Sequence, residues 1–550
     1  MSFIAVPTQT EAVKDLRDAV MTARIYLDRL RDQLTKHSSS GDRHLQFRRH
    51  GYAWMAAYCE AMAAVQFWSE NLAEAGRFFE LEQLIARASV AEYLNQLRFG
   101  VAMSQDEVVR PGDFDEPGDT TCARLADAFG QDPAIARFAQ STVVELGRRI
   151  IDASLKRQSY GDFGLDETHT LIANEFEAFS EKEILPNAHG WHEDDALIPD
   201  QVVAKLADMG VFGLTVREEF GGTGLGKLAM CIVTEELSRG FLGVGSLGTR
   251  SEIAGELIQV NGTAAQKSYY LPKICSGEIL PAAVFTEPDT GSDLSRLSTR
   301  ADRQSNHYIV SGNKTWITHA ARSDLMTLLV RTDPNEKGHR GLTMLLADKT
   351  RGTDSDPFPD DAISGGEIPV IGYRGLKEYD LAFDGFKVPV DAALGGLEGQ
   401  GFKQLMNTFE SARIQTAARA LGVARNALDF GFDYAGTRMQ FGNPILSYER
   451  VYGKLARILV ESMAVRQLTY MAARKKDQGG RSDVEAGMAK LLAARLAWSA
   501  ADNVLQIHGG IGFAAETPIS RLLCDARILS IFEGAAEIQA EIIARGLLGR

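Results

Sequence analysis

The sequence lacks several features that would place it in a specialised class of protein. Only five of its 550 residues are cysteines, and they are far apart and without the spacing of metal ligands. Such cysteines indicate reduced thiols and exclude a disulfide framework. No uninterrupted apolar run is long enough to cross a bilayer, and the first residues lack the basic flank and apolar core of a signal peptide. We therefore expect a cytoplasmic protein without a metal site.

The sequence also lacks an excess of positively charged residues. Its formal net charge is -14, which argues against a general affinity for nucleic acid or for anionic membranes. Hydrophobic residues make up 45% and charged residues 24% of the chain, as in ordinary globular proteins. A chain of 550 residues is too long for one hydrophobic core, so several domains are expected.

The apolar pattern divides the chain into four regions. Residues 1–160 show repeated amphipathic helical periods and form an N-terminal helical extension without any obvious chemical constellation. Residues 161–280 are again helical, residues 281–395 are rich in strand patterns, and residues 396–550 return to long helices. The expected fold is mainly α, with a small central β-domain between a helical domain and a C-terminal bundle of four helices.

Within the β-region the pattern favours a small antiparallel barrel or sandwich. The strands His307–Val310 and Lys314–Thr318 flank Ser311–Asn313, which resembles a hairpin turn. The polar segment Thr350–Gly366 is expected to be a surface excursion.

One carboxylate near the C-terminus stands at an unusual junction. The apolar run Ile528–Phe532 ends at Glu533 and Gly534, and a helical period resumes at Ile538. A carboxylate at such a junction suits proton abstraction beside a carbonyl. An acid that merely complements the dipole of the next helix explains the same pattern, and this segment alone favours that simpler interpretation.

Five segments, the last of which contains Glu533, occur in a fixed order. They are VFTEPDTGSD at 284–293, TWIT at 315–318, RMQFG at 438–442, QIHGGIG at 506–512 and FEGAAEIQ at 532–539. Together they resemble the acyl-CoA dehydrogenase family over residues 166–550. The family's helix–strand–helix order is the order that the apolar pattern predicts here.

The resemblance implies bound FAD. Phe285 and Thr286 match positions at the pyrimidine end of the flavin, and Trp316 and Thr318 match positions that flank its ring. Directed hydrogen bonds and an aromatic wall suit a neutral ring of this kind.

A second group of residues matches positions that hold the FAD pyrophosphate and adenine of a neighbouring subunit. A guanidinium suits a pyrophosphate, and glycines let the backbone approach it; a helix-ending turn explains the glycines equally well. If the match holds, the protein is a homo-oligomer, in the simplest case a homodimer. The residues are Arg438, Phe441, Gln506, His508, Gly509 and Gly510.

The resemblance also assigns the chemistry. Glu533 matches the catalytic base, which removes the α-proton of an acyl thioester while the β-hydrogen leaves as hydride to the flavin; electrons then pass to electron-transfer flavoprotein. Some family members carry the base on the long helix instead, but that position here is Ala412. Ala535 and Ala536 replace the hydroxyl residues usual after Glu-Gly, so one flavin contact is expected to be missing.

The acyl group is expected to carry a second carboxylate. Arg250 lies in a small, apolar segment, and a buried guanidinium without a partner costs several kcal/mol. A short, branched dicarboxylic acyl-CoA would supply that partner, although an ion pair with Glu252 or Glu256 explains the arginine equally well. The resemblance adds further positions near the substrate. These are Ser292, Thr249, Arg413, Phe532 and Gly534.

Other functions remain open from the sequence. A glutaryl-CoA or other short-chain acyl-CoA dehydrogenase would share these motifs. A flavin monooxygenase on the same fold would need no base at Glu533, and a non-catalytic scaffold is suggested only by the N-terminal helices.

Overall fold

A computed structural model of the protein describes residues 8–36 and 44–549. The chain separates into two compact units. Unit 1 comprises Met1–Leu171 together with Thr416–Arg550, and unit 2 comprises Ile172–Gln415. Among the residues that the structure describes, no helix is both long and apolar enough to cross a membrane.

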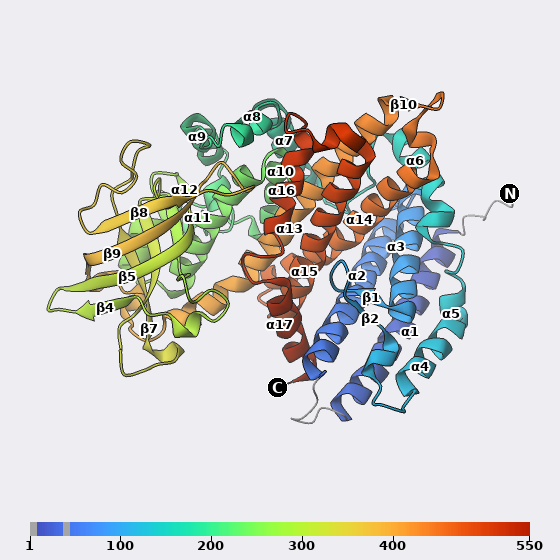
Figure 1. Cartoon of the computed structure of the whole chain (residues 1–550), viewed down its shortest axis with the longest axis horizontal. Helices are drawn as coiled ribbons and strands as arrows, with labels where there is room; N and C mark the ends of the chain where they lie inside the picture. Colours follow the sequence, from blue (N-terminus) through green and yellow to red (C-terminus); the bar gives the residue numbers. More distant parts are fainter. Residues whose placement is uncertain (1–7, 37–43, 550) are drawn as a thin grey trace. The chain divides into compact units, whose positions relative to one another are not determined.

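Unit 1 is helical (Figure 1). Besides the second half of the long helix α13 (Gly401–Thr437), which begins in unit 2, it contains two short strand pairs, β1 (Val101–Ala102) with β2 (Val108–Val109) and β10 (Met439–Gln440) with β11 (Asn443–Pro444). Its other helices are α1 (Gln9–Lys36), α2 (Leu45–Glu74), α3 (Glu80–Phe99), α4 (Thr121–Gln131), α5 (Pro133–Ala136), α6 (Val143–Arg157), α14 (Glu449–Asp477), α15 (Asp483–His508), α16 (Pro518–Ile528) and α17 (Ala536–Leu548).

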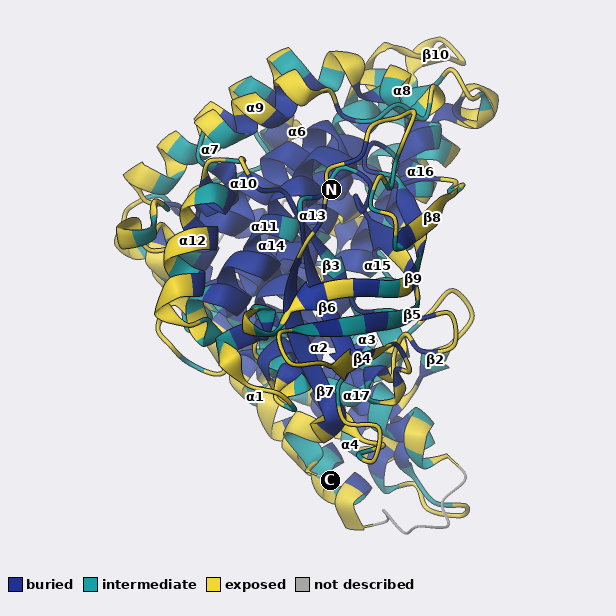
Figure 2. Ribbon diagram, turned by 90° about the vertical axis from the view of Figure 1, so that its left-hand side faces the viewer, coloured by how far each residue is buried: buried dark blue, intermediate teal, exposed yellow. Residues whose placement is uncertain are grey.

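The N-terminal helices share one core with the C-terminal helices. Helix α2 packs against α1, α3, α14, α15 and α17, and most of α2 is buried in Figure 2. Alanines at Ala53, Ala57, Ala61 and Ala64 are fully or almost fully buried, and such small residues let helices approach closely. The extension is therefore part of the same hydrophobic core as the C-terminal bundle, and not an appendage to it.

The segment after α6 is bound tightly within unit 1. The Arg77 guanidinium donates to both carboxylate oxygens of Asp162, at 2.8 and 2.6 Å, and Trp68 Nε1 donates to the Asp162 carbonyl at 2.9 Å. The guanidinium of Arg466, on α14, lies 3.9 Å from the centre of the Phe163 ring. These contacts join the extension to the rest of unit 1.

Unit 2 combines helices with one sheet. Its helices are the later part of α7 (Glu167–Phe179), α8 (Leu185–Glu193), α9 (Asp200–Asp208), α10 (Gly226–Gly240), α11 (Leu242–Asn261), α12 (Ala264–Cys275) and the first half of α13. Its strands are β3 (Pro281–Val284), β4 (Arg300–Arg303), β5 (His307–Thr318), β6 (Leu325–Arg331), β7 (Leu342–Asp348), β8 (Ile363–Ile368) and β9 (Glu378–Pro389).

The seven strands form a single sheet in the order β3-β6-β4-β5-β9-β8, with β7 also paired to β6. One apolar cluster joins the sheet to α11 and α12, and it includes Leu257, Leu271 and Leu329. A second cluster lies among the strands and includes Val310 and Leu328. The expected mainly α fold with a small β-domain and an additional N-terminal helical region is thus confirmed.

The hairpin predicted at Ser311–Asn313 is wrong, because β5 runs without a turn from His307 to Thr318. Its pairing with β9 shifts register between Val310 and Ser311. Gly312 has a φ of 143°, and a Cβ there would lie 2.8 Å from Thr299 Cα. The glycine therefore serves a bulge and a close backbone approach, which short-range patterns do not distinguish from a turn.

One further expectation about the β-region is wrong, and another holds except at the end of its segment. The sheet is not wholly antiparallel, because β3 and β4 each pair in parallel with β6. The end of the polar segment Thr350–Gly366 belongs to β8, which pairs with β9 at one edge of the sheet. An exposed edge strand containing Gly365 and Gly366 lacks the apolar alternation that identifies buried strands.

Candidate active site

The residues expected at the pyrimidine end of the flavin follow directly after β3 in unit 2. The Thr315 backbone N–H donates to the Thr286 carbonyl at 3.0 Å. Lys314 Nζ donates to the Phe285 carbonyl at 2.9 Å and to Glu287 Oε1 at 3.0 Å. Burial alone would raise the pKa of Glu287, but the charge of Lys314 and several hydrogen bonds lower it to about 2. A buried ion pair that the sequence reasoning missed thus fixes the backbone on both sides of Thr286.

Trp316 lies at an irregularity in β5. The pairing of β5 with β9 shifts register between Lys314 and Ile317, and Trp316 has a left-handed φ of 58° with 55% of its surface exposed. A positive φ is rare for a bulky residue, and bulges re-aim side chains next to active sites. The local backbone therefore presents an indole to the surface, where a flat ring could pack against it.

Thr318 is bound to a carboxyl group that the sequence reasoning also missed. Thr318 Oγ1 donates to Glu378 Oε1 at 2.8 Å, and Glu378, the first residue of β9, is only 5% exposed. Burial raises the pKa of Glu378 to about 7, although the Thr318 bond and the charge of Arg250 oppose this rise. The only signal in the sequence was a charged residue immediately before the alternating segment that begins at Tyr379.

Arg250 and Thr249 lie on α11, which packs against the sheet. Thr249 is fully buried and Arg250 partly buried. The charge of Arg250 acts on Glu378 and also on His319, a buried residue whose pKa burial lowers to about 4. Arg250, Thr318, Glu378 and His319 therefore form one electrostatically connected group in unit 2.

The two acids considered as surface partners of Arg250 have another partner. Lys227, on α10, donates to the carboxylate of Glu252 and, at 3.0 Å, to Glu256 Oε2. All three side chains are at most 10% exposed. Lys227 therefore pairs with both acids inside this buried cluster.

The remaining substrate positions of unit 2 lie apart from this group in the chain. Ser292 is exposed in the turn before Leu294. Arg413, on α13, has its guanidinium carbon 5.9 Å from the centre of the Phe409 ring.

Glu533 lies between α16 and α17 in unit 1, with a left-handed φ of 52°. Thr416 Oγ1 and Arg419 Nη2, both on α13, donate to Glu533 Oε2, the second at 2.6 Å. The Arg419 guanidinium carbon also lies 4.8 Å from the centre of the Phe532 ring. The carboxylate is 15% exposed, whereas Arg419 is fully buried. These contacts direct Glu533 towards α13 and do not require the helix-dipole role that the sequence left open.

The backbone next to Glu533 is held from two other helices. Lys490 Nζ, on α15, donates to the Gly534 carbonyl at 2.6 Å. Gln539 Nε2, on α17, donates to the carbonyls of Glu533 and Gly534, at 3.2 and 3.1 Å. Gly534 has a φ of 92°, a conformation that glycine adopts without steric cost. The loop that carries Glu533 is therefore fixed by hydrogen bonds to its side chain and its backbone.

The exposed hairpin β10–β11 carries two of the residues expected at the FAD of a neighbouring subunit. Phe441 and Gly442, with φ of 51° and 82°, form its turn, and Phe441 is 90% exposed. Arg438 immediately precedes the hairpin and is also exposed. An isolated two-stranded hairpin is marginal in water, and exposed large apolar side chains of this kind mark interaction sites when they gather in a patch.

In the glycine segment after α15 the backbone is exposed at Gly509 and Gly510. Gln506 is exposed near the end of α15, and a Cβ placed at Gly509 or Gly510 would meet no atom within 4 Å. The His508 ring stacks on Tyr434 at 4.2 Å between ring centres. In unit 1 the exposed glycine backbone and the Arg438 guanidinium suit phosphate groups. In unit 2 the exposed indole of Trp316 suits a flat ring.

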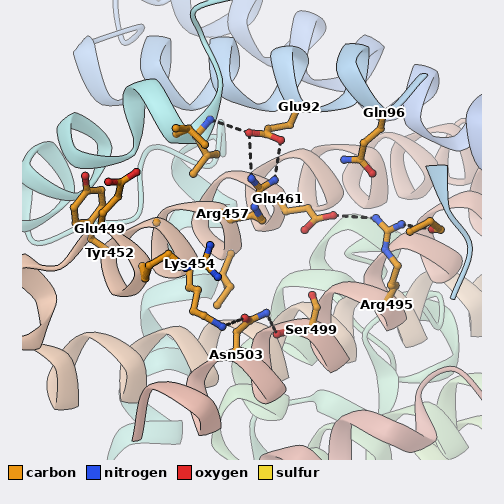
Figure 3. Close-up of a pocket in the computed structure, with 16 residues that line it drawn as sticks. Glu92, Gln96, Glu449, Tyr452, Lys454, Arg457, Glu461, Arg495, Ser499 and Asn503 are labelled. Carbon is orange, nitrogen blue, oxygen red and sulfur yellow. Dashed lines mark hydrogen bonds and ion pairs between the residues drawn. The ribbon is translucent and has the colours of Figure 1, made fainter. Parts of the chain in front are cut away.

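A cavity of about 530 Å³ within unit 1 is lined by none of the residues expected to bind FAD or substrate. Figure 3 shows it between the extension and the C-terminal helices, with Glu92 paired to Arg457 at 2.8 Å and Glu461 paired to Arg495 at 2.9 Å. The first pair joins α3 to α14. This polar cavity thus belongs to the junction of the extension with the bundle, and its pairs explain how the two are held together.

The chain is similar to a known protein over almost its whole length. Models of the N-terminal, middle and C-terminal domains of acyl-CoA dehydrogenase match residues 166–278, 282–386 and 399–548. A (2S)-methylsuccinyl-CoA dehydrogenase of Cereibacter sphaeroides is 54% identical over 546 residues, which covers 98% of this chain and 97% of that protein.

Solved structures agree with the domain matches. Butyryl-CoA dehydrogenase from Megasphaera elsdenii is 30% identical, with a TM-score of 0.66 over 70% of this chain and 100% of its own. A glutaryl-CoA dehydrogenase from Mycobacterium smegmatis, in complex with FADH2, is 26% identical, with a TM-score of 0.63 over 70% of this chain and 96% of its own. This chain belongs to the acyl-CoA dehydrogenase family, and it is an FAD-dependent oxidoreductase.

Proposed function

We propose that this acyl-CoA dehydrogenase oxidises (2S)-methylsuccinyl-CoA to mesaconyl-CoA. The observation that carries the proposal is the identity of 54% to an enzyme of that name, which extends over 98% of the chain and so includes the N-terminal extension. The family models match only from residue 166 onward, and the two solved structures cover 70% of the chain.

The proposal assigns the free carboxylate of the substrate to Arg250. A guanidinium in a small, apolar segment gains most from a carboxylate partner, because a charge-assisted pair offsets the cost of removing both groups from water. The charge of Arg250 also acts on the buried carboxyl group of Glu378, so Glu378 belongs to the same proposed site.

In the proposed mechanism Glu533 is the base. Bound FAD supplies the acceptor for the hydride that leaves the β-carbon. Glu533 removes the α-proton onto its carboxylate, and its backbone N–H donates to the thioester oxygen as negative charge develops there. Phe532 and Gly534, on either side of the base, contribute to the substrate site, together with Ser292, Thr249 and Arg413. A monooxygenase would not require Glu533.

We further propose that the enzyme works as a homodimer and passes electrons to electron-transfer flavoprotein. The exposed Phe441 and the open backbone at Gly509 and Gly510 suit contact with the FAD of a second copy. The extension buries helices of the C-terminal bundle and would thus limit assembly beyond two copies. Sedimentation of the intact protein should give the mass of two chains; a monomer with full FAD would refute the shared site.

The function is tested by anaerobic bleaching of the bound flavin with a panel of thioesters. Methylsuccinyl-CoA should bleach the flavin faster, and at lower concentration, than glutaryl-CoA or butyryl-CoA. A preference for glutaryl-CoA would keep a dicarboxylic substrate but change its identity. A preference for butyryl-CoA would remove the role given to Arg250.

A further inference from the structure

Two hydrogen bonds end on one oxygen of the base, and a third joins the two donors. Arg419 Nη2 lies 2.6 Å from Glu533 Oε2 and 2.7 Å from Thr416 Oγ1, and Thr416 Oγ1 itself donates to the same Glu533 oxygen. Arg419 and Thr416 are three residues apart on α13 and so lie on the same face of that helix. The triangle they form with Oε2 fixes both the position and the rotation of the carboxylate.

The burial of the two charged partners is unequal. Arg419 is fully buried, whereas Glu533 retains 15% exposure. Burying a guanidinium is costly unless a carboxylate compensates it. The arginine therefore lies inside, whereas the carboxylate that compensates its charge stays partly exposed.

The other charged groups around Glu533 act on different atoms. From α15, Lys490 donates to the Gly534 carbonyl. From α17, Glu537 lies in the first turn and is exposed, and Gln539 contributes only neutral hydrogen bonds. Arg419 is thus a cation in direct hydrogen-bond contact with the Glu533 carboxylate.

We propose that Arg419 is a positioning residue for catalysis, which orients the Glu533 carboxylate through Oε2 and keeps it ionised and ready to accept the α-proton. The inference rests on the proposed role of Glu533 as the base. It predicts that Arg419 affects proton abstraction from every acyl thioester to the same degree, because the contact is with the base and not with the acyl group.

The test compares Arg419→Gln and Arg419→Lys as FAD-bound proteins with the wild type. Arg419→Gln should lower kcat about 100-fold, the scale expected for a misplaced catalytic group. It should also move the acid limb of the kcat/KM profile at least one pH unit higher, since the unpaired carboxylate would hold its proton more tightly. Arg419→Lys should restore the position of the acid limb at least in part. A second readout is the exchange of the substrate α-proton with solvent deuterium, which should slow in parallel.

Two controls separate positioning from folding. Arg425→Gln changes another arginine of α13, one whose guanidinium lies 5.8 Å from the Phe163 ring centre, and should leave the acid limb in place. Thr416→Val removes a neutral donor to Oε2 and should slow proton exchange without a comparable shift of the acid limb. If Arg419→Gln does not fold, Arg419→Lys and Thr416→Val decide the matter. Both should exchange the α-proton more slowly than the wild type, because neither keeps both donors to Oε2 in their native geometry; wild-type exchange rates in both would overturn the proposal.

The outcomes also distinguish this inference from the proposed function. In a Glu533→Gln background, Arg419→Gln should cause no further loss, because it acts through the base. A loss confined to dicarboxylic thioesters would overturn the inference and make Arg419 a substrate-binding residue. If butyryl-CoA proves to be the preferred substrate, the same variants are measured with that thioester, so the substrate assignment fails while the positioning role is still tested. Retained activity in Glu533→Gln would refute the base itself.

Discussion

Replacing Glu378 by glutamine should stabilise the protein, and more strongly at alkaline than at acidic pH. Glu378 is buried, and its pKa is raised from 4.5 to about 7. Between these two values the folded chain holds a proton that the unfolded chain has lost, so stability falls as the pH rises through this window. The penalty is complete above pH 7 and amounts to about 3 kcal/mol for a pKa difference of this size.

Glutamine at position 378 removes this penalty, and its side-chain oxygen can still accept the hydrogen bond from Thr318. Because part of the penalty is already present at pH 6, the advantage of Glu378→Gln should grow by roughly 1–2 kcal/mol between pH 6 and pH 8.5. For a unit of this size that corresponds to roughly 3–6 °C in the thermal midpoint.

Thermal unfolding of the FAD-bound wild type and variant at several pH values provides the assay. Asp380→Asn, an exposed position two residues further along β9, is the matched control and should show no such trend. Equal midpoints of wild type and Glu378→Gln across the pH range would refute the reasoning, because a carboxyl that ionises in the buried site must weaken the fold.

Three further substitutions test the roles proposed for Glu533, Arg250 and Lys314. Glu533→Gln should keep its FAD but lose dehydrogenation about 10³-fold or more; activity within tenfold of the wild type would place the base elsewhere. Arg250→Ala should raise the KM for methylsuccinyl-CoA about 10- to 100-fold, as for a lost charge-assisted hydrogen bond, while leaving butyryl-CoA turnover unchanged; equal losses on both substrates would mean a structural arginine. Lys314→Met should leave Glu287 buried without its partner, and FAD content measured by absorbance should fall; full occupancy with unchanged stability would show that this pair does not support Thr286.

The helical parts of the fold were accessible from the sequence because their signals are local. Helix α15, for example, begins at Asp483 and ends at His508, where its apolar period starts and stops. The β-region was less accessible. Gly312 looks like a turn residue over a short window, and only its contact with Thr299, a residue on the neighbouring part of the sheet, reveals a bulge.

The residues of the candidate site also differ in how far the sequence alone reveals them. Motif residues such as Trp316 and Glu533 stood out because their neighbours in the chain resemble a known pattern. Their supporting groups did not, since Arg419 is 114 residues from Glu533 and Glu378 is 60 residues from Thr318. Such pairs come together only through tertiary packing, and a single sequence carries no periodic signal for them.

The shared core of unit 1 has a consequence for how the chain is synthesised. The apolar surface of α2 is completed by α14, α15 and α17, but α6 ends at Arg157 and α14 begins only at Glu449. At a translation rate of roughly 5–20 residues per second, the ribosome needs about 15–60 s to make the intervening segment. During that interval the helices that cover the apolar surface of α2 have not yet been synthesised. The nascent chain should therefore depend on chaperones that shield this apolar surface until the last helix has been made.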